Sequence, residues 1–378
     1  MHGYVQFILN NIFISRVGSM TKYLFVVCQH GSHGKVADLA ILKNCIRERV
    51  GALQTAGSAI DLTVWDTSVN SGLKSDKGTA KCGVAMYNAL QPVLHEWITT
   101  KRALIASQGG SMHFSCVGHS FGGILLRELV HTLCNDPVVL DALDVKKDLE
   151  FESFVTVATP HCGIAMLSWG LAYGAYAIGM VYSQTYLDLA MGSDMLWSTM
   201  LTAPYLDALK RFKRRVSFAN LHKDPLVPFV TAAMCFDAEQ KKGIEAAFKE
   251  RPGERMLDGL FWSLPAAPEA APIPPSRLAS AMAWAEHSAL VLQRCGWEIA
   301  PIRYDGIAPF AHSTIVRTTP RGVVMLDVAS TMASCVIPQA WLSPDLPPQQ
   351  GPTPSSPPQA DVSPTPIVPP QAIPVPAA

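Results

Sequence analysis

The segment Met112–Gly123 constrains this chain more than any other, because it reads as a buried strand that breaks at a serine and continues as a helix. An apolar run ends in Gly118-His119-Ser120-Phe121-Gly122, and leucine and valine then recur at helical spacing. Glycines two residues before and after Ser120 let strand and helix approach closely, and let the serine adopt a strained backbone conformation. The pattern predicts that Ser120 is a nucleophile at the carboxyl end of a strand. The alternative is a glycine-rich turn with a solvated serine.

Strands and helices alternate around this segment. Runs with strand character are Tyr23–Cys28, Ile60–Trp65, Phe154–Ala158, Arg215–Asn220 and Glu298–Tyr304. Helical spacing occurs in Val36–Val50, Thr79–Arg102, Arg277–Arg294 and Val323–Val336. This order predicts an α/β protein with a doubly wound, mostly parallel sheet. Apolar residues make up 49% of the chain and charged residues only 16%, which predicts a large buried core.

Composition divides the chain into one folded domain and several appended parts. We expect residues 20–342 to form the domain, and residues 1–19 to be an N-terminal extension without the features of a signal peptide. Residues 343–378 are rich in proline, glutamine and serine, which predicts a disordered tail. Residues 238–280 are charged at first and then rich in proline and alanine, which predicts an insertion.

A second predicted insertion covers residues 163–200 and begins with the uncharged stretch Gly163–Tyr182. This stretch approaches the length of a membrane span, but its glycines and tyrosines make it weakly hydrophobic for one. It also lies between two strands of the predicted sheet. We therefore predict an apolar lid or a helix of the acyl pocket, with a lid that makes a peripheral contact between residues 163–182 and a membrane as the intermediate alternative.

Net charge and cysteine content restrict which binding partners and which cellular compartment we expect for the protein. The formal net charge is zero and no basic stripe is visible, which excludes nucleic acid as a partner. The nine cysteines are scattered and form no C-x-x-C pair. That pattern predicts reduced thiols and a cytoplasmic protein, with membrane association as the alternative.

A serine hydroxyl becomes a good nucleophile when a histidine accepts its proton and a carboxylate orients that histidine. Asp224 and His312 follow Ser120 in the order expected on a sheet of this kind, and each lies in a loop after a predicted strand. The alternative for Asp224 is a surface-turn aspartate. His119 is held too close to Ser120 by the backbone to act as its base.

Acyl transfer places negative charge on a carbonyl oxygen, which main-chain N–H groups can stabilise. We predict that the amides of Phe121 and Ser32 form this oxyanion hole. The side chains of His30, His119 and His161 are expected to border the substrate pocket. For His161, a hydrogen-bonded structural histidine is an equal alternative.

Several stretches between residues 22 and 318 match, in order, the pattern of a known family: His30-Gly31-x-x-Gly34-x-x-x-Asp38-Leu39, Gly118–Gly123, Phe154-Val-Thr-Val-Ala-Thr-Pro160-His161-x-Gly163, Ala219-Asn220-x-x-x-Asp224-x-x-Val227-Pro228, and Gly296-Trp297-Glu298 with Ala311-His312. The chain thereby resembles the putative serine esterase family of lipase-like α/β-hydrolases. The resemblance implies an α/β-hydrolase fold, a Ser120–Asp224–His312 triad, and lipid or other acyl esters as substrates. Phe121 and Ser32 stand where the family usually has leucine, which leaves the preferred acyl chain length open.

These observations favour a serine esterase or lipase that works through an acyl-enzyme and requires neither a metal nor an organic cofactor. Two alternatives remain. The same triad could transfer the acyl group to an acceptor other than water, or take it from a thioester. A non-catalytic hydrolase fold could instead act as a membrane-associated binding module through residues 163–182 and the proline-rich tail.

Overall fold

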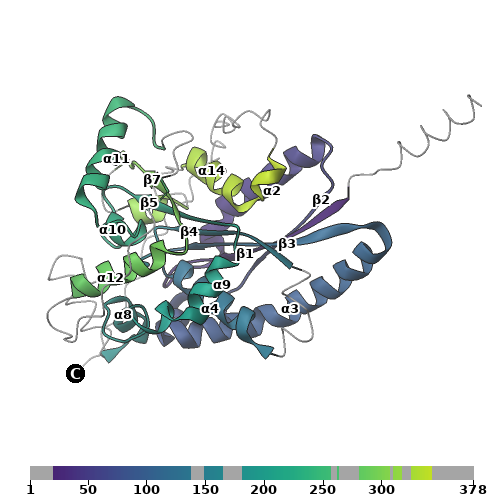
Figure 1. The fold of residues 1–378 in the computed structure, drawn as a ribbon, viewed down its shortest axis with the longest axis horizontal. Helices are drawn as coiled ribbons and strands as arrows, with labels where there is room; N and C mark the ends of the chain where they lie inside the picture. The colour runs from purple at the N-terminus through teal and green to yellow at the C-terminus, as the bar shows by residue number, and fades with distance from the viewer. Residues whose placement is uncertain are drawn as a thin grey trace, which may run out of the picture.

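The computed structural model describes residues 20–137, 149–164, 181–256, 262–263, 281–306, 310–316 and 325–342. Its strands are β1 (Thr21–Gln29), β2 (Ile60–Asp66), β3 (Gly110–His119), β4 (Leu149–Val157), β5 (Arg214–Asn220), β6 (Trp262–Ser263) and β7 (Glu298–Ile302). They form one sheet in the order β2-β1-β3-β4-β5-β7-β6 (Figure 1). All neighbours pair in parallel except β6 with β7. The predicted doubly wound, mostly parallel sheet of an α/β-hydrolase fold is confirmed.

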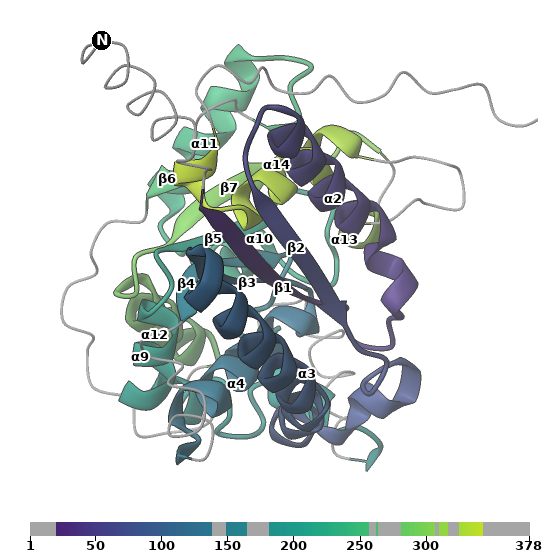
Figure 2. The same cartoon turned by 90° about the vertical axis from the view of Figure 1, so that its right-hand side faces the viewer.

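Helices cover both faces of the sheet (Figures 1 and 2). The α-helices are α2 (Ala40–Thr55), α3 (Thr79–Gln108), α4 (Phe121–Asn135), α8 (Gln184–Leu189), α9 (Ala203–Lys210), α10 (Phe229–Ala232), α11 (Ala238–Glu250), α12 (Ala281–Gln293), α13 (Ala311–Thr314) and α14 (Leu326–Val336). Short 3₁₀ turns are η1 (Val36–Leu39), η2 (Gly72–Lys77), η3 (Thr199–Leu201) and η4 (Gln339–Trp341).

Two apolar cores, one on each face, hold these layers together. Along β1, Tyr23, Phe25 and Val27 enter the core shared with α3 and α4. The alternate residues Leu24, Val26 and Cys28 enter the core shared with α2 and α14. Successive side chains of a strand point to opposite faces, so a strand buried on both faces must be apolar throughout. This requirement explains the uninterrupted apolar run that predicted β1.

Several predicted segments lie outside the described residues, namely the extension 1–19, the tail 343–378 and residues 165–180 of the predicted lid. The predicted lid and domain boundaries stay predictions. In the insertion predicted at 238–280, the structure has the helix α11, whose first turn is capped by the Asp237 side chain. Among the helices of the described residues, no candidate membrane-spanning segment occurs.

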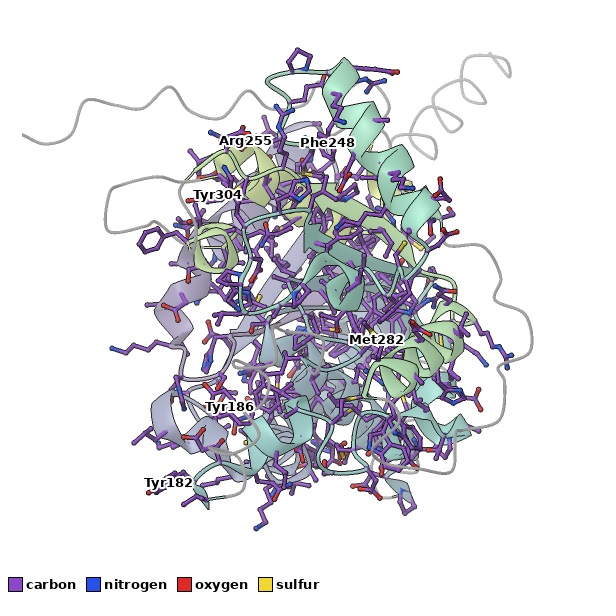
Figure 3. All side chains as sticks on the ribbon, turned by 90° about the vertical axis from the view of Figure 1, so that its left-hand side faces the viewer. Tyr182, Tyr186, Phe248, Arg255, Met282 and Tyr304 are labelled. Atoms are coloured by element: carbon purple, nitrogen blue, oxygen red, sulfur yellow. The ribbon has the colours of Figure 1, made fainter. Side chains whose placement is uncertain are left out.

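The parallel strands determine where the functional groups gather. Loops that follow β1, β3, β5 and β7 all leave the sheet at its carboxyl edge, which faces the viewer in Figure 3. Ser120 follows β3, Asp224 follows β5, and His312 follows β7. Residues separated by up to 192 positions in the chain therefore meet at one edge.

Candidate active site

Ser120 lies on a strained turn between β3 and α4, with φ 54° and ψ −129°. Non-glycine residues seldom adopt a positive φ, and such strain is concentrated at functional sites. A Cβ atom on Gly118 would lie 2.6 Å from the amide nitrogen of Gly123, and one on Gly122 would lie 2.4 Å from the carbonyl oxygen of Gln29. The amide of Ser120 donates to the carbonyl of Val157, at 2.8 Å, which ties the turn to β4. The two flanking glycines are therefore steric requirements of this turn.

A chain of hydrogen bonds joins Ser120, His312 and Asp224. The Nε2 atom of His312 lies 2.9 Å from Oγ of Ser120, and its Nδ1 atom lies 3.0 Å from Oδ2 of Asp224. The side chains of His312 and Asp224 are only 8% and 1% exposed. In this arrangement Nδ1–H can donate to the carboxylate while Nε2 accepts the serine proton. The structure thus brings the three predicted residues into one chain of hydrogen bonds, and their catalytic roles stay a prediction.

The carboxylate of Asp224 is held in its ionised form. Burial alone would raise its pKa, but hydrogen bonds from His312, Asn220 and the amide of Val227 outweigh burial and lower the pKa below the ordinary value of 3.8. The side-chain amide of Asn220 donates to Oδ2 at 2.9 Å, and the amide of Val227 donates to Oδ1 at 2.9 Å. Asp224 therefore carries a negative charge at neutral pH, directed at His312.

The loop after β1 passes directly over Ser120. A Cβ atom on Gly31 would lie 2.8 Å from Cβ and 3.3 Å from Oγ of Ser120, so the glycine allows this approach. Within the described residues, the amides of Ser32 and Phe121 donate to no acceptor. Phe121 directly follows Ser120, and Ser32 directly follows Gly31, so both amides belong to the two segments that meet at the serine. Their role in stabilising an oxyanion stays a prediction.

His30 supports the loop after β1 through contacts of its ring. It is buried, its Nε2 atom lies 3.0 Å from Oγ of Ser71, and its Nδ1 atom lies 2.9 Å from the carbonyl oxygen of Gly31. The amide of Gly72 also donates to the carbonyl of Gly34 at 3.1 Å. The ring of His30 is therefore engaged by the protein on both nitrogens and fixes the loop, and its place at the border of the substrate pocket stays a prediction.

His161 is completely buried behind the sheet edge. Its Nε2 atom lies 2.9 Å from Oγ1 of Thr156, and its ring packs against that of Trp297 with centroids 4.9 Å apart. Burial, with a smaller contribution from the nearby Arg127 guanidinium, lowers its pKa well below 6.5, so the ring is neutral. This placement favours the structural alternative for His161 over a position in the substrate pocket.

Sequence reasoning missed the roles of Asn220 and Ser71, which support Asp224 and His30. For Asn220 a signal existed, because a polar residue closes an otherwise buried strand just before the predicted acid. For Ser71 no signal was available, since its partner is set by the packing of two loops.

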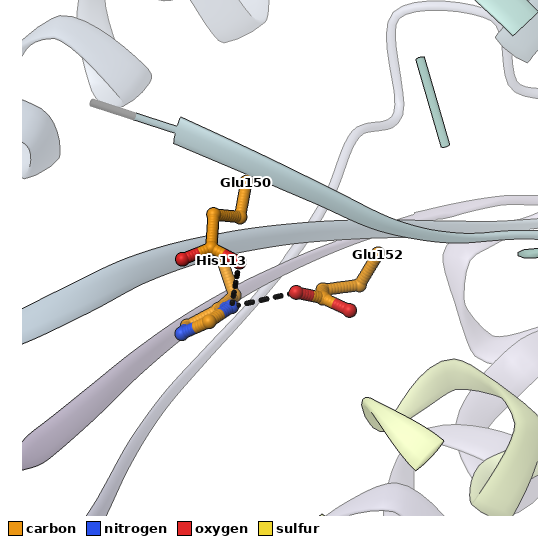
Figure 4. Close-up of side chains that lie close together, drawn as sticks. All are labelled: His113, Glu150 and Glu152. Atoms are coloured by element: carbon orange, nitrogen blue, oxygen red, sulfur yellow. Dashed lines mark hydrogen bonds and ion pairs between the residues drawn. The ribbon is translucent and has the colours of Figure 1, made fainter. Parts of the chain in front are cut away.

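A second cluster of ionisable side chains lies at the opposite, amino edge of the sheet (Figure 4). Nδ1 of His113 lies 2.8 Å from Oε1 of Glu152 and 3.9 Å from Oε2 of Glu150. One ligand atom from each residue falls within 4.8 Å of the others, a spacing that could hold a metal ion. However, the ammonium group of Lys213 donates to Glu150 at 2.6 Å and to Glu152 at 2.7 Å. Lys213 thus already supplies the positive charge, and the cluster is an ionic network.

These groups line a cavity of 860 Å³ that also includes Arg214, Glu298 and Trp341. The cavity opens at the starts of β3 and β4, whereas Ser120 follows the end of β3. It therefore lies at the amino edge of the sheet, at the opposite end of the strands from Ser120.

The network predicts a measurable contribution of Glu152 to stability. Burial alone would raise the pKa of Glu152, but hydrogen bonds from His113 and Lys213 outweigh it and lower the pKa below 4.5. A carboxylate with a lowered pKa stabilises the fold above the unfolded-state value, and this stabilisation is lost as the pH falls through the folded-state value. Replacing Glu152 by glutamine should therefore lower the free energy of unfolding at pH 7 by about 1–3 kcal/mol. The deficit should shrink as the pH falls below 4.5 and through the lowered pKa of Glu152, as measured by urea denaturation.

Glu150 provides the matched control, because its side chain is 47% exposed whereas that of Glu152 is 6% exposed. Replacing Glu150 by glutamine should cost only about 0–1 kcal/mol. Equal losses in the two variants would contradict the assignment of the network to the buried carboxylate.

Comparison with solved structures gives distant similarities. The chain is similar to a structure from a study of two fungal esterases from Rhizomucor miehei, with 10% identity and a TM-score of 0.35, covering 85% of this chain and 77% of that chain. It is also similar to phospholipase PlaB from Legionella pneumophila, with 14% identity and a TM-score of 0.33, covering 56% of this chain and 42% of that chain. At TM-scores this low, neither structure bears on the site or the substrate.

Sequence comparison is more informative. A curated relative, "Putative lipase C4A8.10" from Schizosaccharomyces pombe, is 28% identical over 222 residues, which cover 55% of this chain and 26% of the relative. The chain thus spans about a quarter of the length of that relative, at 26%. A family model described as "Putative serine esterase" matches residues 20–237, a range that includes Ser120 and Asp224 and ends before His312. Since this match covers more than half of its length, the chain belongs to the putative serine esterase family.

Proposed function

We propose that this protein is a serine hydrolase that cleaves acyl esters, with Ser120, His312 and Asp224 as its catalytic triad. The observation that carries the proposal is the hydrogen-bond chain from Oγ of Ser120 through both ring nitrogens of His312 to Asp224, at 2.9 Å and 3.0 Å. Family membership supports the same reaction class. The contact to His312 is independent support, because that residue lies beyond the matched range.

In the proposed reaction, Oγ of Ser120 attacks the ester carbonyl carbon while Nε2 of His312 accepts the hydroxyl proton. Asp224 stabilises the imidazolium, and the amides of Phe121 and Ser32 bind the oxyanion. When the tetrahedral intermediate collapses, His312 returns the proton to the leaving alcohol. Water then attacks the acyl-enzyme, gives its proton to His312, and the acid leaves as Ser120 regains its hydrogen.

Exposed apolar residues support a lipid ester as the substrate class. Large apolar side chains are exposed in segments that follow the strands at the carboxyl edge or contact those segments: Leu73, Val181, Tyr182, Leu226 and Phe310. Tyr182, which is 82% exposed, lies on the face seen in Figure 3. It is attached to this edge because the neighbouring Ser183 donates to Asp76 of η2 at 2.7 Å. Exposed apolar side chains on several segments of this edge suit long acyl chains or a peripheral contact with a lipid surface.

A fluorophosphonate probe tests the catalytic proposal, since such probes react with activated serines. The unaltered protein should be labelled on Ser120, and the folded Ser120→Ala protein should not be labelled. A folded, unaltered protein that resists the probe would remove the enzyme assignment and favour the non-catalytic binding module.

Esters of increasing acyl length test the substrate class separately. We expect kcat/KM for p-nitrophenyl esters to rise with chain length, by roughly 0.8 kcal/mol of binding per buried methylene, until the pocket is filled. Matched thioesters, and alcohols added as acceptors, would reveal thioesterase or acyltransferase activity of the same acyl-enzyme. A preference for acetate would contradict the lipid class and leave the esterase proposal intact.

A further inference from the structure

The turn that carries Ser120 supplies two neighbouring side chains, and both reach His312. Oγ of Ser120 contacts the imidazole of His312 at 2.9 Å, whereas Nε2 of His119 lies 2.8 Å from the main-chain oxygen of His312. The two histidine rings are 4.9 Å apart, and His119 is buried. Because a carbonyl oxygen can only accept, Nε2 of His119 must carry the proton in this bond.

The element that carries His312 depends on such a bond. The helix α13 has only four residues, Ala311–Thr314, and a helix this short has little stability of its own. The amides of Ser313 and Thr314 donate to the carbonyl of Phe310, and the amide of Ile315 donates to that of Ala311. Within the described part of the chain, the carbonyl of His312 accepts its hydrogen bond from the side chain of His119. A buried carbonyl without a partner is unfavourable, so this bond favours the observed position of His312.

The bond from His119 also affects how the base, His312, is aligned with the nucleophile, Ser120. The backbone makes His119 and Ser120 neighbours, and the amide of Ser120 is bound to β4 through Val157 at 2.8 Å. A bond from His119 to the backbone of His312 therefore connects the loop of the base to the same rigid turn that holds the nucleophile. Proton transfer is sensitive to displacements of about 1 Å in the reacting groups, which can cost about 10²-fold in rate.

We infer that His119 is a positioning residue, whose Nε2–H···O bond to His312 keeps the base aligned with Ser120. This inference rests on the proposed function. His119 acts through His312 and has no direct part in the chemistry. Its loss should reduce the rate of acylation and leave ground-state binding of the ester unchanged, because the displaced group is the base and the substrate pocket stays intact.

Two substitutions at position 119 separate hydrogen bonding from packing. His119→Phe keeps a planar ring and removes the donor, and we expect kcat to fall by about 10²-fold with KM changed by no more than roughly twofold. His119→Gln places an amide N–H near the position of Nε2, and it should restore kcat to within roughly tenfold of the unaltered protein. The matched control is His131→Phe in α4. The His131 ring stacks on that of Tyr205, with ring centroids 3.6 Å apart, and does not contact the triad residues.

Three readouts are needed on the full-length protein: kcat and KM for a p-nitrophenyl ester, the rate of fluorophosphonate labelling, and the unfolding midpoint. The expected result is slow labelling of His119→Phe, recovery in His119→Gln, and normal labelling of His131→Phe. Normal kcat in His119→Phe, an equal loss in the glutamine variant, or an equal loss in the control would each overturn the inference. If the unaltered protein is not labelled at all, the proposed function fails. If it is labelled but substitutions at position 119 do not change the labelling rate, only the inference about His119 fails.

Discussion

Replacing Ser120 by alanine is expected to lower kcat for ester hydrolysis by about 10⁴- to 10⁶-fold. Without Oγ no acyl-enzyme can form, so the residual rate comes from water attack on an ester held near the oxyanion donors. The fold should persist, because the substitution removes one hydrogen bond, that between Ser120 and His312 at the carboxyl edge of the sheet, and alanine fits the same space. Steady-state kinetics on a p-nitrophenyl ester, together with a thermal unfolding curve, measure both expectations.

The same experiment becomes sharper when it includes His312→Ala and the double variant. Residues that act as a unit show strongly non-additive losses, so the double variant should be scarcely slower than either single variant. If the losses multiplied, Ser120 and His312 would act in separate steps, and the hydrogen bond of 2.9 Å between them would not be a catalytic contact. Substantial turnover by a folded Ser120→Ala protein would transfer the nucleophile to another residue.

Much of the fold follows from the sequence, because buried parallel strands must be apolar on both faces. Tyr23–Cys28 predicts β1 for this reason, and the structure extends the strand by only a few residues, to Thr21–Gln29. Boundaries were harder to predict. The helix α3 contains Pro92 and continues past the predicted end at Arg102 to Gln108. It continues because Leu104 and Ile105 pack against the core that the sheet shares with α3 and α4. Such packing overrides the local preferences on which a prediction of helix ends depends.

The charged start of the predicted insertion at 238–280 shows a different limit of predicting secondary structure from sequence. The structure has the helix α11 there, with Ile244 and Phe248 buried four residues apart and the Asp237 side chain as its cap. Both signals were present in the sequence, but two apolar positions among many charges are weaker than the stripe of a fully packed helix. The short edge strand β6 was also not predicted, since two residues carry no measurable periodicity.

For the candidate site, chain order and strand ends were enough to propose Ser120, Asp224 and His312, because the carboxyl ends of parallel strands share one edge. Side-chain direction could not be predicted in the same way. His30, His119 and His161 all follow or end a strand near that edge, yet the first holds a loop, the second contacts the backbone of His312, and the third is buried against Trp297. These differences arise from contacts between distant segments, which spacing along the chain does not encode.

The second large effect is expected at Asp224, where asparagine should lower kcat by about 10⁴-fold and leave the fold in place. The asparagine NH₂ group can only donate to Nδ1 of His312, so the ring must carry its proton on Nε2. That tautomer cannot accept the proton of Ser120. The main-chain amides of Leu226 and Val227, which donate to Oδ1 of Asp224 at 3.1 Å and 2.9 Å, can still donate to the asparagine oxygen. Far-UV circular dichroism and steady-state kinetics separate the two expectations.

The pH dependence gives an independent test of the same carboxylate. Because hydrogen bonds lower the pKa of Asp224 below 3.8, its ionised form contributes stability above that value, and the contribution is lost as the pH falls through the folded-state pKa. The difference in unfolding free energy between the unaltered protein and Asp224→Asn should therefore be constant near neutral pH and shrink below about pH 4. The matched control is Asp237→Asn, because Asp237 caps α11 through the amides of Glu239 and Gln240, a role that asparagine also fills. Normal turnover in Asp224→Asn, or an equal loss in Asp237→Asn, would remove Asp224 from the triad, since only a carboxylate bonded to Nδ1 can select the tautomer that Ser120 needs.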